Sequence, residues 1–148
     1  MSHHKSQHVC NYTTKQLYDL VIDVESYPDF LPWCTRVEII RSKGNIIIAE
    51  MVIEFANITQ SYTSKVTFEE PHKIEVEMIE GPFNYLYNKW IFTELPSGET
   101  NLQFEIDFKF NSKLLEKLIA LMFDRAVSKL TDAFLKRAEK KYTTGHLR

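Results

Sequence analysis

The sequence predicts an α+β fold. We expect a curved antiparallel sheet of about six or seven strands wrapped around a long C-terminal helix, with two short helices after the first strand. Apolar and polar residues alternate from Leu102 to Phe110, as in a strand with one buried face and one solvated face. From Ser112 to about Tyr142 the apolar residues recur with a helical period. Short connections between the predicted strands favour a meander, whose apolar face the helix would cover.

Size and composition fit this fold class. The chain has 148 residues, of which 44% are hydrophobic, and only four glycines. It is therefore long enough for one domain with a substantial core. We expect a single domain over residues 1–148, with a flexible tail from about residue 143. The formal net charge is −2, which gives the whole molecule no long-range attraction to nucleic acid.

The first third of the chain is predicted to contain a strand, a helix and a broken segment. Residues 3–10 read as the strand. Thr13 and Gln16 have the spacing of a capping box, so a helix begins there. Its apolar face consists of Leu17, Leu20, Val21 and Val24. Ser26–Cys34 contains two prolines, which favour a loop or a broken helix.

The middle of the chain alternates apolar and polar residues between turn signals. The turns are expected at Lys43–Asn45, Pro71–His72, Gly81–Pro82 and Pro96–Gly98. The strands are predicted over residues 37–40, 46–58, 62–68, 74–78, 89–95 and 102–110. The C-terminal helix then has Ser112 as its expected N-cap. Its apolar stripe is widened by Leu114, Leu121 and Phe123, which implies burial on more than one side, against the 28–34 segment, a ligand or a second copy.

Two segments are unusually rich in aromatic residues. Ser26–Cys34 carries four large apolar side chains, which are Tyr27, Phe30, Leu31 and Trp33. They can plug the core, form the lip of a cavity, or touch a membrane. Gly81–Phe92 is the second segment, and its Gly-Pro break would let a strand edge bend and a pocket open. A strand pair within the core is the simpler alternative.

The sequence offers little for catalysis. Cys10 and Cys34 form no metal pattern with a histidine, and His72 lies in a predicted turn, where a histidine is usually solvated. The alternating carboxylates belong to the wet face of strands; they are Glu75, Glu77, Glu105 and Asp107. Polar candidates within a pocket are Tyr62, Tyr85, Tyr87 and Asn88, which suit orienting a ligand carbonyl better than acid–base chemistry.

The C-terminal end of the chain is basic. Cations are concentrated at Lys136, Arg137, Lys140 and Lys141. Such an end can favour an anionic membrane or RNA. The simpler interpretation is a set of cations that stabilise the C-terminus of a helix.

Three stretches of sequence resemble a known family. They are Asp23–Cys34, then Gly81-Pro-Phe with Leu86 and Trp90-Ile-Phe92, and then the helix with Met122, Ala126, Phe134, Arg137 and Ala138. Together they are similar to the coenzyme Q-binding proteins, which include the bacterial RatA-type proteins and belong to the START-like, helix-grip, polyketide cyclase-like superfamily. The resemblance runs from about Ser6 to Tyr142. The chain has Asn88 where the family often has glycine.

The resemblance implies a non-enzymatic protein. It would bind ubiquinone or a related isoprenoid lipid in a hydrophobic cavity and support respiratory electron transport as a quinone chaperone. One bacterial branch of the family is instead a toxin that blocks the association of ribosomal subunits, and this is the alternative function. No catalytic residue, metal or further cofactor is expected.

The resemblance and the apolar pattern together identify candidate ligand-binding residues. They are Tyr27, Phe30, Leu31, Pro32, Trp33, Phe83, Leu86, Trp90, Phe92, Leu118 and Met122. The expected partners are the lipid and, transiently, the inner membrane, with docking through Pro28–Trp33 and the basic helix end. A ribosomal subunit and a homo-oligomer stay open as further partners. We find no signal or transit segment, so a bacterial cytoplasmic setting is expected, with contact at the inner membrane.

Overall fold

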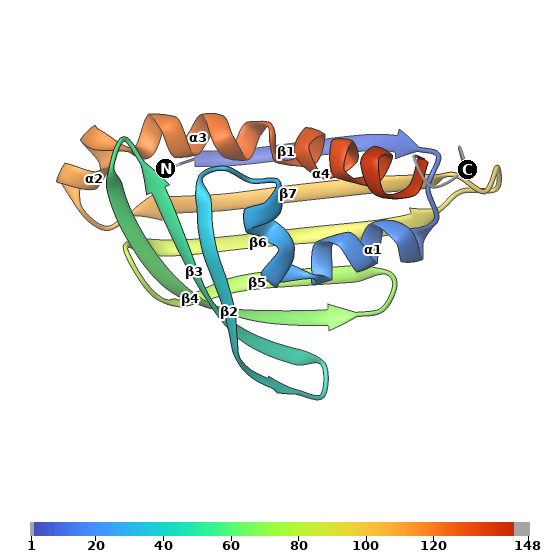
Figure 1. The fold of residues 1–148 in the computed structure, drawn as a ribbon, viewed down its shortest axis with the longest axis horizontal. Coiled ribbons are helices and arrows are strands. Elements are labelled where there is room, and N and C mark those ends of the chain that lie inside the picture. The colour runs from blue at the N-terminus through green and yellow to red at the C-terminus, as the bar shows by residue number, and fades with distance from the viewer. Residues whose placement is uncertain (1, 144–148) are drawn as a thin grey trace.

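A computed structural model of the chain describes residues 2–143 (Figure 1). The first elements are β1 (Ser2–Cys10), α1 (Thr14–Ile22) and the 3-10 helix η1 (Val24–Asp29). The strands that follow are β2 (Cys34–Lys43), β3 (Ile46–Phe55), β4 (Ile58–Glu69), β5 (Lys73–Glu80), β6 (Phe83–Glu94) and β7 (Thr100–Phe110). The last are α2 (Lys113–Leu118), α3 (Ala120–Ser128), α4 (Leu130–Ala138) and the π-helical turn η2 (Glu139–Thr143). From residue 144 on, the expected flexible tail lies outside the described residues.

The seven strands form one antiparallel sheet in the order β1-β7-β6-β5-β4-β3-β2. Register shifts in the β2–β3, β4–β5 and β6–β7 pairs mark irregularities that bend the sheet. The helices lie together on its concave face, with α2 and α1 toward opposite ends of the molecule (Figure 1). The predicted fold class, a curved antiparallel meander closed by C-terminal helices, is confirmed.

One predicted strand ends three residues earlier than expected, and the next strand begins earlier, at Ile58. We expected a single strand over residues 46–58, but the chain reverses at Ala56 and Asn57, which have φ of 51° and 66°. Phe55 then pairs with Ile58 in a two-residue hairpin. Asparagine tolerates this left-handed conformation and alanine rarely adopts it, so the sequence signal for the turn was weak.

The second difference lies at the start of β6, which begins at Phe83 and not near Lys89. The Gly81–Pro82 break is a tight turn and not a wide loop. Gly81 has φ of 156°, and a Cβ there would lie 2.4 Å from the Cβ of Tyr62. Glycine is therefore required where β5 returns past β4 into β6.

The long C-terminal helix is interrupted twice. The backbone leaves helical geometry at Ile119 and Lys129, with φ of −129° and −109°. Ile119 is almost completely buried, at 1% exposure, whereas α2 buries none of its residues. The first interruption therefore anchors Ile119 in the core and leaves Leu114 and Leu118 of α2 exposed, while Leu115 packs partly buried against the core.

The core lies between the concave face of the sheet and the helices. The predicted inner face of β7 is buried throughout and consists of Leu102, Phe104, Ile106, Phe108 and Phe110. Phe123 contacts it from α3, at ring-centroid distances of 4.8 Å to Phe108 and 5.7 Å to Phe110. Edge-to-face packing of this kind adds about 0.5–1.5 kcal/mol per pair beyond burial.

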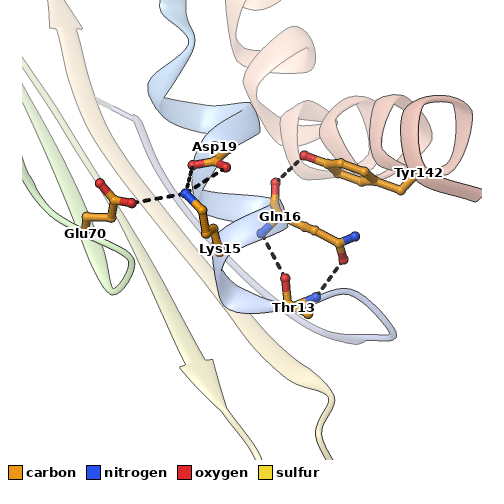
Figure 2. A network of polar contacts seen from close by, with 6 residues as sticks. All are labelled: Thr13, Lys15, Gln16, Asp19, Glu70 and Tyr142. Atoms are coloured by element: carbon orange, nitrogen blue, oxygen red, sulfur yellow. Dashed lines mark hydrogen bonds and ion pairs between the residues drawn. The ribbon is translucent and has the colours of Figure 1, made fainter.

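A polar network holds α1 in place (Figure 2). The predicted capping box is confirmed: the Gln16 N–H donates to Thr13 Oγ1 at 3.0 Å, and the Thr13 N–H donates to Gln16 Oε1 at 2.9 Å. Lys15 Nζ lies 3.2 Å from carboxylate oxygens of both Asp19 and Glu70. The hydroxyl of Tyr142 donates to the carbonyl of Gln16 at 2.8 Å, which ties η2 to α1.

Candidate ligand-binding cavity

A cavity of about 70 Å³ lies between the sheet and the helices. Its floor comes from β2 to β7, with Val37, Ala49, Met51, Tyr62, Ser64, Val66, Val76, Leu86, Asn88, Trp90 and Ile106. Its roof comes from α3 and α4, with Phe123, Val127, Leu130 and Phe134. Val24, Tyr27, Leu31 and Trp33, from the segment between α1 and β2, close one side. The lining is mostly apolar, with a few polar groups, as is usual for a small-molecule site.

An aromatic cluster closes the cavity under η1. The ring of Phe134 lies 4.9 Å from Trp90, 5.0 Å from Phe30 and 5.3 Å from Tyr27, between ring centroids. The hydroxyl of Tyr27 donates to the carbonyl of Val21, at the end of α1. Burial raises the pKa of Tyr27, so this phenol stays protonated. The cluster couples η1, α4 and β6 into one packed wall.

A second aromatic cluster lies farther along the cavity. Trp33 stacks on Phe55 with ring centroids 5.8 Å apart and an interplanar angle of 18°. Phe123 meets Trp33 at 6.2 Å and Phe55 at 5.9 Å, edge to face. Trp33 and Phe55 are half-buried, whereas Phe123 is fully buried. Trp33 therefore connects the cavity to the surface.

Two polar atoms of the lining are buried without a hydrogen-bond partner among the described residues, namely Ser64 Oγ and Asn88 Oδ1. Ser64 belongs to β4 and Asn88 to β6, on either side of β5. Both residues line the same cavity, two strands apart: Asn88 pairs with Val76 of β5, and Ser64 pairs with Met78, two residues farther along β5. An unsatisfied buried polar group costs about 1–3 kcal/mol, so these atoms favour a ligand that can hydrogen-bond to them.

The lining holds no group prepared for acid–base or nucleophilic chemistry among the described residues. Cys34 follows the lining residue Trp33 but does not itself line the cavity, and burial raises its pKa to about 12, so this thiol stays protonated and unreactive at neutral pH. Burial also raises the pKa of Tyr62, whose hydroxyl lies 2.9 Å from the sulfur of Met51. No cluster of three or more His, Cys, Asp or Glu residues able to hold a metal occurs within residues 2–143.

The predicted site residues separate into two groups. Five line the cavity, and these are Tyr27, Leu31, Trp33, Leu86 and Trp90. The other six lie elsewhere, and these are Phe30, Pro32, Phe83, Phe92, Leu118 and Met122. Phe83 and Phe92 are buried in other parts of the core, and Phe30 packs on the outer side of Phe134.

The placement of Leu118 differs most from expectation. Its side chain is 45% exposed, because the interruption at Ile119 turns α2 away from the sheet. Met122 is half-buried beside the core, and Pro32 is exposed. Leu118 and Met122, which were expected from the helical stripe, and Pro32, which was expected from the Ser26–Cys34 segment, are therefore not among the residues that line this cavity.

Strand alternation explains which of the polar candidates face the cavity. Tyr62 and Asn88 point into the cavity, but Tyr85 and Tyr87 lie on the outer face of β6. The hydroxyl of Tyr87 donates to Glu75 at 2.6 Å, and this bond holds the pKa of Glu75 below its usual range. Ser64 was missed, although its alternation with Tyr62 and Val66 could have placed it on the inner face.

The two segments expected to dock on a membrane, Pro28–Trp33 and the basic helix end, differ in burial. Within Pro28–Trp33, Leu31 is buried, Phe30 and Trp33 are half-buried and Pro32 is exposed. At the basic end, Arg137 lies 3.7 Å from Asp29 and its guanidinium sits 5.3 Å from the ring of Phe30. Lys136, Lys140 and Lys141 are exposed.

A START-like sheet wrapped over C-terminal helices, with an apolar cavity between them, defines a class of lipid-binding and cyclase proteins. The chain belongs to the polyketide cyclase / dehydrase and lipid transport family, whose model matches residues 10–135. It is 41% identical over 133 residues to the ribosome association toxin RatA of Rickettsia prowazekii, covering 87% of this chain and 90% of the relative. It is 31% identical over 138 residues to the mitochondrial coenzyme Q-binding protein COQ10 homolog B of Xenopus laevis, covering 90% of this chain and 57% of that protein. The resemblance seen in the sequence is confirmed.

A solved structure shares the fold at lower identity. The Zhui aromatase/cyclase from Streptomyces sp. R1128 has a TM-score of 0.81, covering 95% of this chain and 94% of that chain, at 17% identity. This likeness shows the fold alone. The two sequence relatives carry the names of a toxin and a binding protein, not of enzymes. No helix within residues 2–143 combines the length and the apolar character needed to cross a bilayer.

Proposed function

We propose that the protein binds an isoprenoid quinone or a related lipid in this cavity and presents it to respiratory enzymes without catalysing a reaction. One observation carries the proposal: an apolar cavity contains two buried polar atoms, Ser64 Oγ and Asn88 Oδ1, that no described residue satisfies. A relative named as a coenzyme Q-binding protein supports it.

The chemistry of the lining matches a quinone. A quinone ring is flat and offers carbonyl oxygens, which accept hydrogen bonds. The Ser64 hydroxyl can donate to one of them, and a half-turn of the Asn88 amide would present its NH₂ group to another. The isoprenoid tail needs only apolar cover, which stabilises it by about 25 cal/mol per Å² buried. The ring would lie on the sheet floor, and the tail would pass between Tyr27, Trp33 and the helices.

The cavity must widen to hold such a ligand. Its volume is about 70 Å³, whereas sites for drug-sized ligands measure about 300–1,000 Å³. Tyr27 and Trp33 are half-buried at the margin, so their rotation exposes less apolar surface than movement of the floor would. We therefore expect ligand entry to displace these two side chains first.

Intrinsic fluorescence gives a direct test, because the chain has two tryptophans and both Trp33 and Trp90 line the cavity. A short-tailed ubiquinone should quench this emission saturably. Ser64→Ala and Asn88→Leu should each weaken binding about 5–30-fold, the effect of losing one hydrogen bond. Ser61→Ala, on the exposed face of the same strand, is the matched control.

A second measurement uses the protein purified from a quinone-producing host, analysed by native mass spectrometry with organic extraction. A quinone at near-stoichiometric amount supports the proposal. An empty protein that shows no saturable quenching with added quinone would rule the quinone out as its ligand.

A second candidate function is association with a ribosomal subunit, since a relative at 41% identity is named as a ribosome association toxin. The exposed cations Lys136, Lys140 and Lys141 on α4 and η2 are the available contact with RNA. Phosphate contacts make such binding steeply dependent on salt. This function needs no occupied cavity.

Sedimentation with purified ribosomal subunits separates the two functions. Changing Lys136, Lys140 and Lys141 to Gln should abolish co-sedimentation and its salt dependence. Lys5 and Lys109, which are exposed on the outer face of β1 and β7, supply the control when changed to Gln. Unchanged association of the triple variant would exclude this surface.

A further inference from the structure

The exposed side of α2 and the start of α3 carries an unusual apolar surface. Leu114 and Leu121 are each 63% exposed and Leu118 is 45% exposed, and we call these three the leucine face. The other large apolar residues exposed among the described residues are Val9, Ile40, Ile79 and Tyr85. Those four are dispersed over different strands, whereas the three leucines fall within eight residues of one another. Single exposed apolar residues are ordinary, but a group of this kind marks a contact surface.

The leucine face is held in its orientation by the fold. Ser112 caps α2, since its hydroxyl accepts from the Leu115 N–H at 3.3 Å. Ile119 is buried, and its backbone bonds to Leu115 on one side and Phe123 on the other. These contacts fix α2 at the opposite end of the molecule from α1 (Figure 1). The leucines therefore point outward because of anchored neighbours.

Cations frame the leucine face. Lys113, Lys117 and Arg125 are exposed, and none forms an ion pair with another described residue. Leu121 lies four residues before Arg125 on α3, so the two share one side of that helix. The nearby Asp124 is engaged by His4 Nε2 at 2.8 Å. The exposed surface thus combines three leucines with three unpaired positive charges.

We propose that the leucine face docks on the surface of an anionic lipid bilayer. Leucines of an interfacial helix insert at the boundary of headgroups and acyl chains, while flanking Lys and Arg contact the lipid phosphates. In this arrangement the leucines contact acyl chains and the cations contact lipid phosphates. Membrane contact was expected from Pro28–Trp33 and the basic helix end. The large apolar side chains of that segment are at least half-buried, whereas three leucines of α2 and α3 are exposed beside unpaired cations, so α2 and α3 combine both components in one surface.

A second copy of the chain fits this surface less well. In a two-fold dimer the same patch meets itself, so Lys113, Lys117 and Arg125 would face identical cations. RNA fits less well too, because it would neutralise the cations and leave the leucines in water. An anionic bilayer gives the leucines apolar cover and the cations phosphate partners.

Docking through this surface would place the cavity next to the membrane. Phe123 and Val127, on the inner side of α3, line the cavity roof, whereas Leu121 lies on its outer side. One helix would thus separate the bilayer from the cavity. Docking through the leucine face does not require the proposed quinone binding.

Flotation with quinone-free vesicles tests the proposal. One set contains neutral phosphatidylcholine alone, and the other adds phosphatidylglycerol. The unmodified protein should float with the anionic vesicles. A variant with Leu114, Leu118 and Leu121 changed to Ser should lose this binding at least about tenfold, since its apolar insertion is removed. A variant with Lys113, Lys117 and Arg125 changed to Gln should lose the preference for anionic lipid.

The matched control changes Val9, Ile40 and Ile79 to Ser, which removes a similar number of exposed apolar side chains from strands. It should bind vesicles like the unmodified chain. Circular dichroism and melting temperature verify that each variant is folded. Binding that is unaffected by the Leu→Ser changes would overturn the proposal, as would a stable dimer that these changes convert to a monomer without altering flotation. Because the vesicles contain no quinone, the flotation result does not depend on whether the protein binds quinone.

Discussion

Phe134 joins the elements that close the cavity, and Phe134→Ala tests this role. The side chain is 2% exposed and makes aromatic contacts with Tyr27, Phe30 and Trp90. Truncation of a buried Phe costs about 3–5 kcal/mol, more where the surroundings cannot collapse. Phe134 already borders a cavity of about 70 Å³. The new space merges with that cavity and stays open, so we expect a loss of about 4–5 kcal/mol in the free energy of unfolding.

Urea unfolding followed by circular dichroism measures this loss. The midpoint should fall at unchanged m-value, since the same surface is exposed on unfolding. Phe92→Ala is the matched control, because Phe92 is 1% exposed and packs on Tyr18 away from the cavity lining. Both variants should be destabilised, but a short-tailed ubiquinone should restabilise the Phe134→Ala variant more, because its cavity is already enlarged. A loss below about 2 kcal/mol, or equal restabilisation of both, would refute the assignment of Phe134 to the cavity roof.

Three further predictions concern the sheet. Tyr87→Phe removes the hydroxyl that donates to Glu75, so an NMR titration should show a higher pKa for Glu75. In the parent chain, the stability that comes from the lowered pKa is present above the ordinary carboxyl range and is lost as pH falls through the folded-state pKa. The variant should therefore lose less unfolding free energy on acidification. Ala56→Gly relieves a φ of 51° and should raise the unfolding free energy by up to about 1 kcal/mol, whereas a value below that of the parent chain would contradict the turn. Gly81→Ala would force its Cβ against Tyr62 at 2.4 Å, and thermal melts should show a loss of at least about 2 kcal/mol; a neutral result would mean that the turn relaxes freely.

Local patterns predicted much of the fold. The alternation from Leu102 to Phe110 placed every inward side chain of β7 correctly, because burial on one face of a strand repeats every two residues. The Thr13–Gln16 capping box placed the start of α1, because it depends on atoms three residues apart. Where the local signal was weak, prediction failed, as at Ala56, whose residue type gives little indication of a left-handed turn.

The candidate site was less predictable than the fold. The aromatic segment Ser26–Cys34 yielded Tyr27, Leu31 and Trp33 as lining residues, because large apolar side chains in so short a segment gain most by packing against the core. Ser64 and Phe123 were not chosen, although both line the cavity. In the sequence, Ser64 is one of many small polar residues within a strand.

The sequence by itself determined the antiparallel sheet, the helical C-terminus, the inner face of β7 and membership of the family, because these follow from periodicity and from residue types at short spacing. The tertiary structure decided which apolar residues border empty space and which border solvent. Leu118 and Phe123 look alike in the helical stripe, yet the interruption at Ile119 leaves the first 45% exposed and buries the second to 2%. A cavity is the space that remains after distant elements have packed, so it depends on the fit of β2 to β7 against η1, α3 and α4 and not on any local pattern.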